Sequence, residues 1–219
     1  MNFYSKQIIH LKEEYKRLAP SYDRKWQGYL SATNDTALSL LNPSLDDVIL
    51  DAAGGTGLLT DQISKFLGKT GKVILVDASK EMLRVAENRL SDLENMHLSL
   101  GDVHNLPFKQ ESFSKVVSVS AFHYFKYPQE TLNEFYRVLK PEGSLIIVDW
   151  CRDSIYFKLF DIFFRRINRP YIRSYTVQEI QYMLTNEGFA IDHANTWHYR
   201  FWPLMGLKAR KLNQKLFKS

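Results

Sequence analysis

Residues 48–60 read VILDAAGGTGLLT, in which an apolar run passes through an aspartate directly into Gly54, Gly55 and Gly57. A continuous run of Val, Ile and Leu is typical of a strand that is buried on both faces of a parallel sheet. The chain has only ten glycines, so three of them within four positions indicate a tight turn or a close approach of the backbone to a ligand. Bare N–H groups at the start of a following helix favour a ligand that is negative or accepts hydrogen bonds. The segment therefore predicts a strand, a glycine turn and a helix, with a ligand at the turn.

Buried strands and amphipathic helices alternate along the rest of the chain. Strands are expected over residues 46–52, 71–77, 96–102, 114–122, 143–150, 189–194 and 196–202. Helices are expected over residues 5–18, 30–41, 58–67, 80–93, 132–139 and 177–187. This alternation predicts an α/β fold, Rossmann-like and doubly wound, with a mostly parallel seven-stranded sheet and helices on both faces. In such sheets the ligand binds beyond the carboxyl ends of the strands, where the strand order reverses.

The 219 residues are expected to form a single domain. We divide it into an N-terminal helical cap (1–45), a cofactor-binding core (46–150), a substrate lid that is inserted after the fifth strand (151–175), and C-terminal strands with a basic tail (176–219). Cys151 is the only cysteine, which excludes a disulfide framework and a cysteine metal cluster. No cluster of histidines and carboxylates has the spacing that metal ligands need, so no metal is expected. The charged N-terminus and the lack of an apolar run of about 20 residues predict a soluble, cytoplasmic protein.

The formal net charge is +5, and the excess lies at the end of the chain, LKARKLNQKLFKS, which contains no acid. Such a tail is typical of a solvated terminal helix. It also suits peripheral contact with an anionic membrane or lipid, or with RNA. The sequence leaves these alternatives open, and it contains no clear nucleic-acid module.

Asp77 ends the second strand, 20 residues after Gly57. A carboxylate at that place accepts hydrogen bonds from the ribose hydroxyls of a nucleoside. The third glycine of the dinucleotide-binding pattern is replaced by Thr60. From these residues alone the ligand is an adenosine-containing cofactor, either NAD or S-adenosylmethionine.

Five segments together carry a family resemblance: VILDAAGGTG, VILVDASKEML, GDVHNLPF, VVSVSAFHYF and EFYRVLKPEGSLIIVDW. In their order and spacing, over roughly residues 20–150, they resemble the class I S-adenosylmethionine-dependent methyltransferases of type 11. The resemblance is greatest to the branch that contains the ubiquinone/menaquinone C-methyltransferases. It implies S-adenosyl-L-methionine as the cofactor and methyl transfer as the reaction.

The resemblance also implies cofactor contacts. Asp51 and the Gly54–Gly57 turn would hold the methionine portion, and the Thr56 hydroxyl would add a contact. The ribose would lie at Asp77 and Ala78, while Asp102 would accept from the adenine amino group. The residues expected to bind the cofactor are Asp51, Gly54, Gly55, Thr56, Gly57, Asp77, Ala78, Asp102, Val103, Ser120 and Tyr22.

Val103 would pack on the adenine ring, and Ser120 would lie beside the methionine portion. Tyr22 and Trp26 are candidates to shield the sulfonium, since its positive charge is attracted to aromatic faces. Simple packing of these two side chains on the sheet explains them equally well.

His123 follows the fourth strand and is the candidate catalytic residue, either as a general base or as a contact to the acceptor. A role in positioning alone also remains open. The quinone-methylating branch carries Arg-Asn where this chain has His123-Tyr124, which argues against the same quinone substrate.

Aromatic residues and arginines crowd the expected lid. They favour a small apolar or aromatic methyl acceptor, such as a phenol, a quinol or a lipid-like molecule. The alternatives are an RNA or protein methyltransferase and a non-catalytic protein that binds an adenosine cofactor. The acceptor atom and the oligomeric state do not follow from the sequence.

Overall fold

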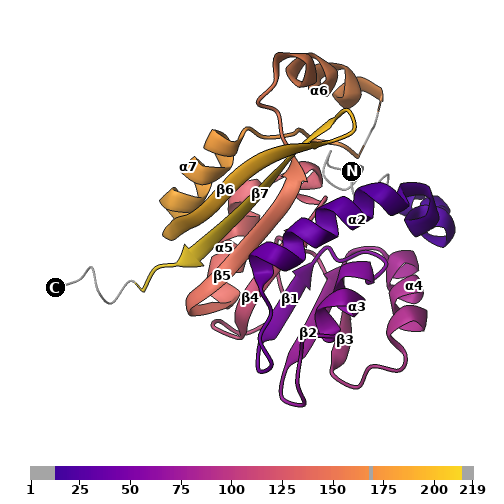
Figure 1. The fold of residues 1–219 in the computed structure, drawn as a ribbon, viewed down its shortest axis with the longest axis vertical. Helices are drawn as coiled ribbons and strands as arrows, with labels where there is room; N and C mark the ends of the chain where they lie inside the picture. Colours follow the sequence, from indigo (N-terminus) through magenta and orange to yellow (C-terminus); the bar gives the residue numbers. More distant parts are fainter. Residues whose placement is uncertain (1–12, 168–169, 214–219) are drawn as a thin grey trace.

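The computed structural model describes residues 13–167 and 170–213, which form a seven-stranded sheet in the order β3-β2-β1-β4-β5-β7-β6 (Figure 1). The strands are β1 Val48–Ala52, β2 Lys72–Asp77, β3 Met96–Leu100, β4 Phe113–Val119, β5 Leu139–Trp150, β6 Phe189–Tyr199 and β7 Trp202–Lys211. The first five strands pair in parallel, and β7 is antiparallel to both β5 and β6. The predicted fold class is confirmed. Strand order reverses between β1 and β4, where a ligand site is expected.

Helices cover both faces of this sheet. They are η1 Ala19–Ser21, α2 Tyr22–Leu41, α3 Leu58–Ser64, α4 Lys80–Leu90, η2 Phe122–Tyr124, α5 Pro128–Val138, α6 Ile155–Ile167 and α7 Val177–Glu187. Alternate residues of each central strand face opposite layers: Ile49 packs with α2 and α3, whereas Leu50 packs with α5 and α7. This explains why the strands read as continuous apolar runs.

Two predicted helix starts are confirmed by their caps. The Ser79 hydroxyl accepts a hydrogen bond from the Met82 N–H (3.3 Å) at the start of α4. At α7, Thr176 and Glu179 form a capping box, and Gly188 ends the helix in the left-handed region. The α7 boundaries therefore follow from local sequence.

The C-terminal strands differ from the prediction. Residues 196–202 are not a separate strand, because β6 continues from Phe189 to Tyr199 and the chain turns at Arg200 and Phe201. The turn uses a positive φ of 56° at Arg200, a conformation that a sequence search for glycine or asparagine misses. The seventh strand is Trp202–Lys211, which the prediction had assigned largely to a basic tail.

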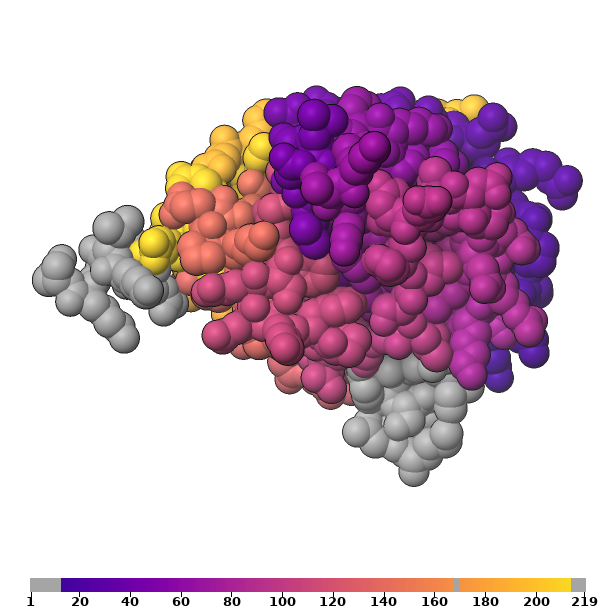
Figure 2. All heavy atoms as spheres, turned by 90° about the horizontal axis from the view of Figure 1, so that it is seen from below, coloured from indigo at the N-terminus to yellow at the C-terminus, as the bar shows by residue number. Residues whose placement is uncertain are grey.

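The described part of the basic tail is therefore neither a helix nor a free arm. Arg210 pairs with Glu142 (2.6 Å) and Asp192 (3.4 Å), and the Lys211 ammonium donates to the Leu139 carbonyl (2.7 Å). Figure 2 shows the yellow end of β7 against the orange part of the chain. Membrane or RNA contact through the tail stays a prediction, and Lys215 and Lys218 lie outside the described residues.

Three other boundaries also differ. Helix α2 begins at Tyr22 rather than at residue 30, with a non-helical residue at Trp26. The strand β4 ends at Val119, before the short η2 helix. The strand β5 begins at Leu139 and passes, through a bulge with a positive φ at Glu142, the proline and glycine that were expected to precede it. Residues 13–18 are helical, as predicted, and residues 5–12 of that prediction lie outside the described part.

Candidate functional site

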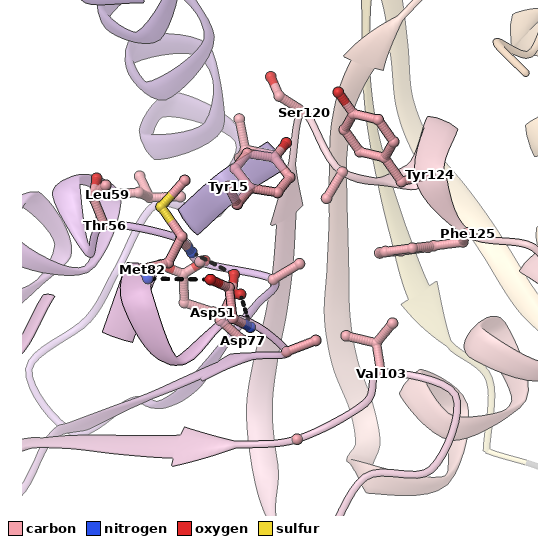
Figure 3. A pocket seen from close by; sticks show the side chains of 18 of the residues that line it. Tyr15, Asp51, Thr56, Leu59, Asp77, Met82, Val103, Ser120, Tyr124 and Phe125 are labelled. Atoms are coloured by element: carbon pink, nitrogen blue, oxygen red, sulfur yellow. Dashed lines mark hydrogen bonds between the residues drawn. The ribbon is translucent and has the colours of Figure 1, made fainter. Parts of the chain in front are cut away.

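A cavity of about 350 Å³ lies at the carboxyl ends of β1 and β4, where the strand order reverses (Figure 3). Ten of the predicted cofactor residues line it: Asp51, Gly54, Gly55, Thr56, Asp77, Ala78, Asp102, Val103, Ser120 and Tyr22. Gly57 and His123 do not. The cavity therefore lies where the topological rule places a ligand site, and its volume is in the range of small-molecule pockets.

The glycine turn forms one wall of the cavity. A Cβ at Gly54 would lie 2.7 Å from the Leu75 side chain and 2.8 Å from the Asp51 carboxyl group, so no larger residue fits without movement. Gly55 and Gly57 have φ values of +57° and +75°, which glycine adopts at little cost. Gly57 serves as the N-cap of α3 instead of contacting the cavity. The turn thus brings bare backbone close to any ligand.

Two residues other than glycine on the wall also have positive φ. Ala53 follows β1 (φ 60°) and Ser120 follows β4 (φ 54°). Such conformations cost about 1–3 kcal/mol and gather at functional sites. The Ser120 hydroxyl lies 2.7 Å from the Tyr29 hydroxyl, which also accepts a hydrogen bond from the Trp150 indole (2.9 Å). This series of hydrogen bonds links the cavity wall to the aromatic side chains that pack under α6.

Two carboxylates lie at the ends of β1 and β2. Asp77 accepts hydrogen bonds from the N–H groups of Gly55 (2.9 Å) and Ser79 (2.8 Å), which orients its carboxylate, while burial raises its pKa. Asp51 is buried and accepts a hydrogen bond from the Thr60 hydroxyl (2.6 Å). Burial raises the pKa of Asp51 to about 7. A cationic ligand group beside Asp51 would restore its charged form.

Asp102 and Val103 lie on the part of the wall after β3. The Asp102 carboxylate is near His104, whose Nδ1 atom is 2.6 Å away and whose backbone N–H donates to it (3.0 Å). The side chains of Met82, Val103 and Phe125 add apolar surface to the same cavity. Figure 3 shows Val103 and Phe125 on the side away from Thr56 and Leu59. Apolar surface beside a carboxylate suits an aromatic base.

Three tyrosines line the same cavity. The Tyr15 ring packs edge-on against Tyr22 (5.9 Å between centroids) and against Tyr124 (6.1 Å). Tyr22 was expected here, whereas Trp26 packs with Tyr29 in an aromatic cluster and is absent from the lining. The sequence analysis missed Tyr15 and Tyr124 as lining residues. No sequence motif marks these two tyrosines, because they come from segments that lie far apart in the chain and meet only in the fold.

Thr56 is held by two side chains outside the glycine turn. Its hydroxyl donates to Asp23 (2.7 Å), and its carbonyl accepts from the Arg89 guanidinium (2.5 Å), which also pairs with Asp23. The Thr56 hydroxyl hydrogen is therefore directed to α2 and not to the cavity. This triad fastens α2 and α4 to the turn.

His123 lies behind the cavity wall. Its Nδ1 atom is 2.5 Å from Asp149 Oδ1, and the same carboxylate accepts from the N–H groups of Phe122 (2.7 Å) and Trp150 (2.6 Å). A carboxylate that accepts all of these bonds fixes the proton on Nδ1. The Nε2 atom is buried and has no hydrogen-bond partner among the described residues. The imidazole stacks on Trp150 at 4.2 Å, and the Tyr124 ring lies 4.1 Å away.

Within the described residues, no group of three His, Cys, Asp or Glu side chains is placed to hold a metal ion. No helix in that part of the chain is long and apolar enough to cross a membrane. Cys151 is buried, and burial raises the pKa of its thiol to about 12, so it is a poor nucleophile.

Comparison with known proteins agrees with this geometry. The family described as "Methyltransferase domain" matches residues 50–147. The ubiquinone/menaquinone biosynthesis C-methyltransferase UbiE of Neisseria gonorrhoeae is 34% identical over 171 residues, which cover 68% of this chain and 69% of that protein. The UbiE protein of Blochmanniella floridana is 41% identical over 105 residues, which cover 47% of this chain and 41% of that protein. The chain spans about half the length of several such relatives.

Among solved structures, a chain of the complex between the Haloferax volcanii Trm112 methyltransferase activator and a methyltransferase has a TM-score of 0.80. Its sequence identity is 18%, and the match covers 91% of this chain and 98% of that chain. This likeness shows the fold. Together, the matches place the chain in the class I S-adenosylmethionine-dependent methyltransferases. Within that class it belongs to the type 11 branch that includes the UbiE C-methyltransferases.

Proposed function

We propose that this protein transfers the methyl group of S-adenosyl-L-methionine to a small apolar or aromatic acceptor, such as a phenol, a quinol or a lipid-like molecule. The observation that carries the proposal is that the cavity and the aromatic cluster below α6 share a wall. Tyr22, Leu30, Leu58 and Tyr124 line the cavity and also pack with Trp150, Phe157 and Tyr171. A cofactor on one side of this wall and an apolar acceptor on the other would meet at the tyrosines.

The described residues fit the cofactor. Asp77 offers lone pairs for ribose hydroxyls, since the N–H groups of Gly55, Ala78 and Ser79 that donate to it leave acceptor capacity on its oxygens. Asp51 suits the ammonium of the methionine portion, and the lack of side chains on the glycine turn lets that portion approach the backbone closely. The rings of Tyr15, Tyr22 and Tyr124 suit the sulfonium. When bound, the cofactor supplies an electrophilic methyl group, and alignment of the acceptor accounts for up to about 7–11 kcal/mol of the barrier.

His123 is assigned the role of base, or of a contact to the acceptor. Asp149 fixes its tautomer, so the Nε2 lone pair is available for a proton. The imidazole packs against Tyr124, which lines the cavity, and against Trp150 and Tyr171 of the aromatic cluster, so it would lie on the acceptor's side of the wall. Structures without ligands often hold catalytic groups away from their final positions. Asp149 acts here as a positioning residue.

The relatives named above are C-methyltransferases of quinone biosynthesis, and this supports a small-molecule acceptor with an acidic carbon. The quinone substrate itself is a weaker proposal, because His123 and Tyr124 replace the Arg-Asn pair of that branch. An aromatic cluster next to the cofactor suits a quinol-like ring as well as other phenols.

The cofactor site is tested by calorimetric titration with S-adenosylhomocysteine and, in parallel, NADH. Tight binding of S-adenosylhomocysteine that Asp77→Ala abolishes is the expected result. The matched control is Asp92→Ala, an exposed carboxylate outside the cavity. Binding of NADH alone would overturn the proposal.

The acceptor is tested by transfer of a labelled methyl group to hydroquinones, phenols, fatty acids and RNA. The expected product is a methylated phenol, quinol or lipid, and labelled RNA as the only product would refute the acceptor class. His123→Asn should lower kcat by about 10²–10⁴-fold and leave S-adenosylhomocysteine affinity unchanged. If affinity and melting temperature fall together with the rate, His123 has only a structural role. If the rate does not change, His123 takes no part.

A further inference from the structure

Helix α6, Ile155–Ile167, carries a second apolar stripe on its exposed side. Its inner face packs through Phe157, Phe160 and Phe164 on the aromatic cluster. The outer face of the helix exposes Ile155, Leu159, Ile162, Phe163 and Ile167. Phe201, in the β6–β7 turn, is also exposed. These five helix positions follow the spacing of one helix face. We call this set the α6 patch.

The α6 patch is a continuous feature and not a scatter of single side chains. Its members are between 54% and 75% exposed, and the Tyr156 hydroxyl donates to the Phe201 carbonyl (3.1 Å), which joins the helix to the turn. Figure 1 shows α6 and this turn together at the edge of the molecule where β5 ends. Contiguous exposed apolar surface of this kind marks an interaction site.

The charges around the α6 patch are mainly positive. Lys158 and Arg166 are exposed and make no ion pair within the described part of the chain, and Arg200 lies over the Tyr199 ring. The acid on this helix, Asp161, is buried and bound to Arg165 and Tyr171. An apolar face flanked by unpaired cations complements a surface that is apolar inside and negative outside.

We propose that the α6 patch docks this protein on an anionic lipid bilayer. The apolar side chains would enter the boundary between headgroups and acyl chains, while Lys158, Arg166 and Arg200 meet lipid phosphates. Long basic side chains extend along an apolar surface to reach such phosphates. This inference goes beyond the proposed reaction, because docking requires neither the cofactor nor the acceptor.

Docking through α6 has a geometric consequence. Helix α6 follows β5 directly, so it lies at the same edge of the sheet as the carboxyl ends of β1 and β4 and the cavity. The aromatic cluster lies between the patch and the cavity wall. A docked molecule would therefore turn its cavity edge toward the bilayer.

The test is flotation of the full chain, without cofactor, with vesicles of phosphatidylcholine alone and of phosphatidylcholine mixed with phosphatidylglycerol. The wild-type protein should float with the anionic vesicles, and added salt should weaken the association. Lys158→Ala with Arg166→Ala should weaken it by about fivefold per cation removed, or on the order of 25-fold together. Leu159→Gln with Phe163→Gln should reduce flotation to background.

The matched controls are Leu45→Gln and Tyr182→Gln, which replace side chains that are 66% and 69% exposed outside the patch. They should float as the wild type does. Unchanged S-adenosylhomocysteine binding by every variant shows that each is folded. The proposal is overturned if the wild type does not float, if Leu159→Gln with Phe163→Gln floats equally well, or if the controls fail alike. The proposal is also overturned if the wild type binds no vesicles but self-associates, and Leu159→Gln with Phe163→Gln removes this self-association. The patch would then bind a second copy of the chain.

Discussion

Asp51→Asn should stabilise the unliganded protein at neutral and alkaline pH while it weakens cofactor binding. Asp51 is buried at the end of β1, and burial raises its pKa from 3.8 to about 7. Its described partner is the Thr60 hydroxyl, which donates to Oδ2. An asparagine keeps an oxygen for that bond and removes the need to bury a charge. The ligand loses the carboxylate that would meet its ammonium group.

The magnitude follows from the linkage between proton binding and folding. Between pH 3.8 and about 7 the native state binds a proton at Asp51 that the unfolded state has released, so stability falls as pH rises through this range. At about 1.4 kcal/mol for each pKa unit, the loss is about 4 kcal/mol at full ionisation. Water entering the cavity would reduce the charge penalty, so 4 kcal/mol is an upper bound. Asp51→Asn lacks this loss.

The assay is urea unfolding of the wild type and Asp51→Asn at several pH values between 4 and 8, without ligand. The difference in unfolding free energy should be small near pH 4 and should grow in favour of Asp51→Asn up to about pH 8. Asp77 also has a raised pKa, and its negative charge contributes to the raised pKa of Asp51, so the difference includes the repulsion between these two carboxylates. Asp92→Asn, at an exposed site, controls for the loss of one carboxylate. A difference that does not vary with pH, or that favours the wild type more as pH rises, would refute the reasoning.

Gly54→Ala should lower the unfolding free energy by about 1–3 kcal/mol, because its Cβ would lie 2.7 Å from Leu75; urea unfolding measures the loss, and unchanged stability would contradict the packing argument. Thr176→Ala should cost about 1 kcal/mol through loss of the capping box and leave S-adenosylhomocysteine affinity unchanged by calorimetry. Arg89→Ala should weaken that affinity, because the guanidinium holds the Thr56 carbonyl in the turn; its melting temperature should also fall, because the largely buried pair with Asp23 fastens α2 and α4 to the turn.

The sheet and the position of the cavity were predictable because they depend on local patterns and on a general rule. Strands buried on both faces, such as β1, read as continuous apolar runs, and the caps of α4 and α7 are encoded within four residues. The strand-end residues Asp51, Asp77 and Ser120 then meet at the reversal of strand order. Each of these inferences uses information from one short segment at a time.

The features that the sequence did not predict depend on contacts between distant segments. Arg200 adopts a positive φ because β6 and β7 pair along their length, and this pairing overrides local preference. His123 does not line the cavity, and Asp149 on the neighbouring strand holds its Nδ1 atom and accepts from the N–H groups of Phe122 and His123. Tyr15 reaches the cavity from a helix with no recognisable motif. Side-chain direction after a strand end cannot be read from spacing alone.

The cavity gathers features that are unfavourable for folding by themselves. Asp51 and Asp77 are buried carboxylates with raised pKa values, and Ala53 and Ser120 hold positive φ angles. Each would be improved by an ordinary substitution, since fewer buried charges and less backbone strain favour the folded state. A ligand that carries an ammonium group and hydroxyls would offset the cost of burying the two carboxylates, because it favours their charged forms. The cofactor should therefore stabilise the fold most strongly above pH 7, where the unliganded protein holds Asp51 ionised without a cationic partner in the described site.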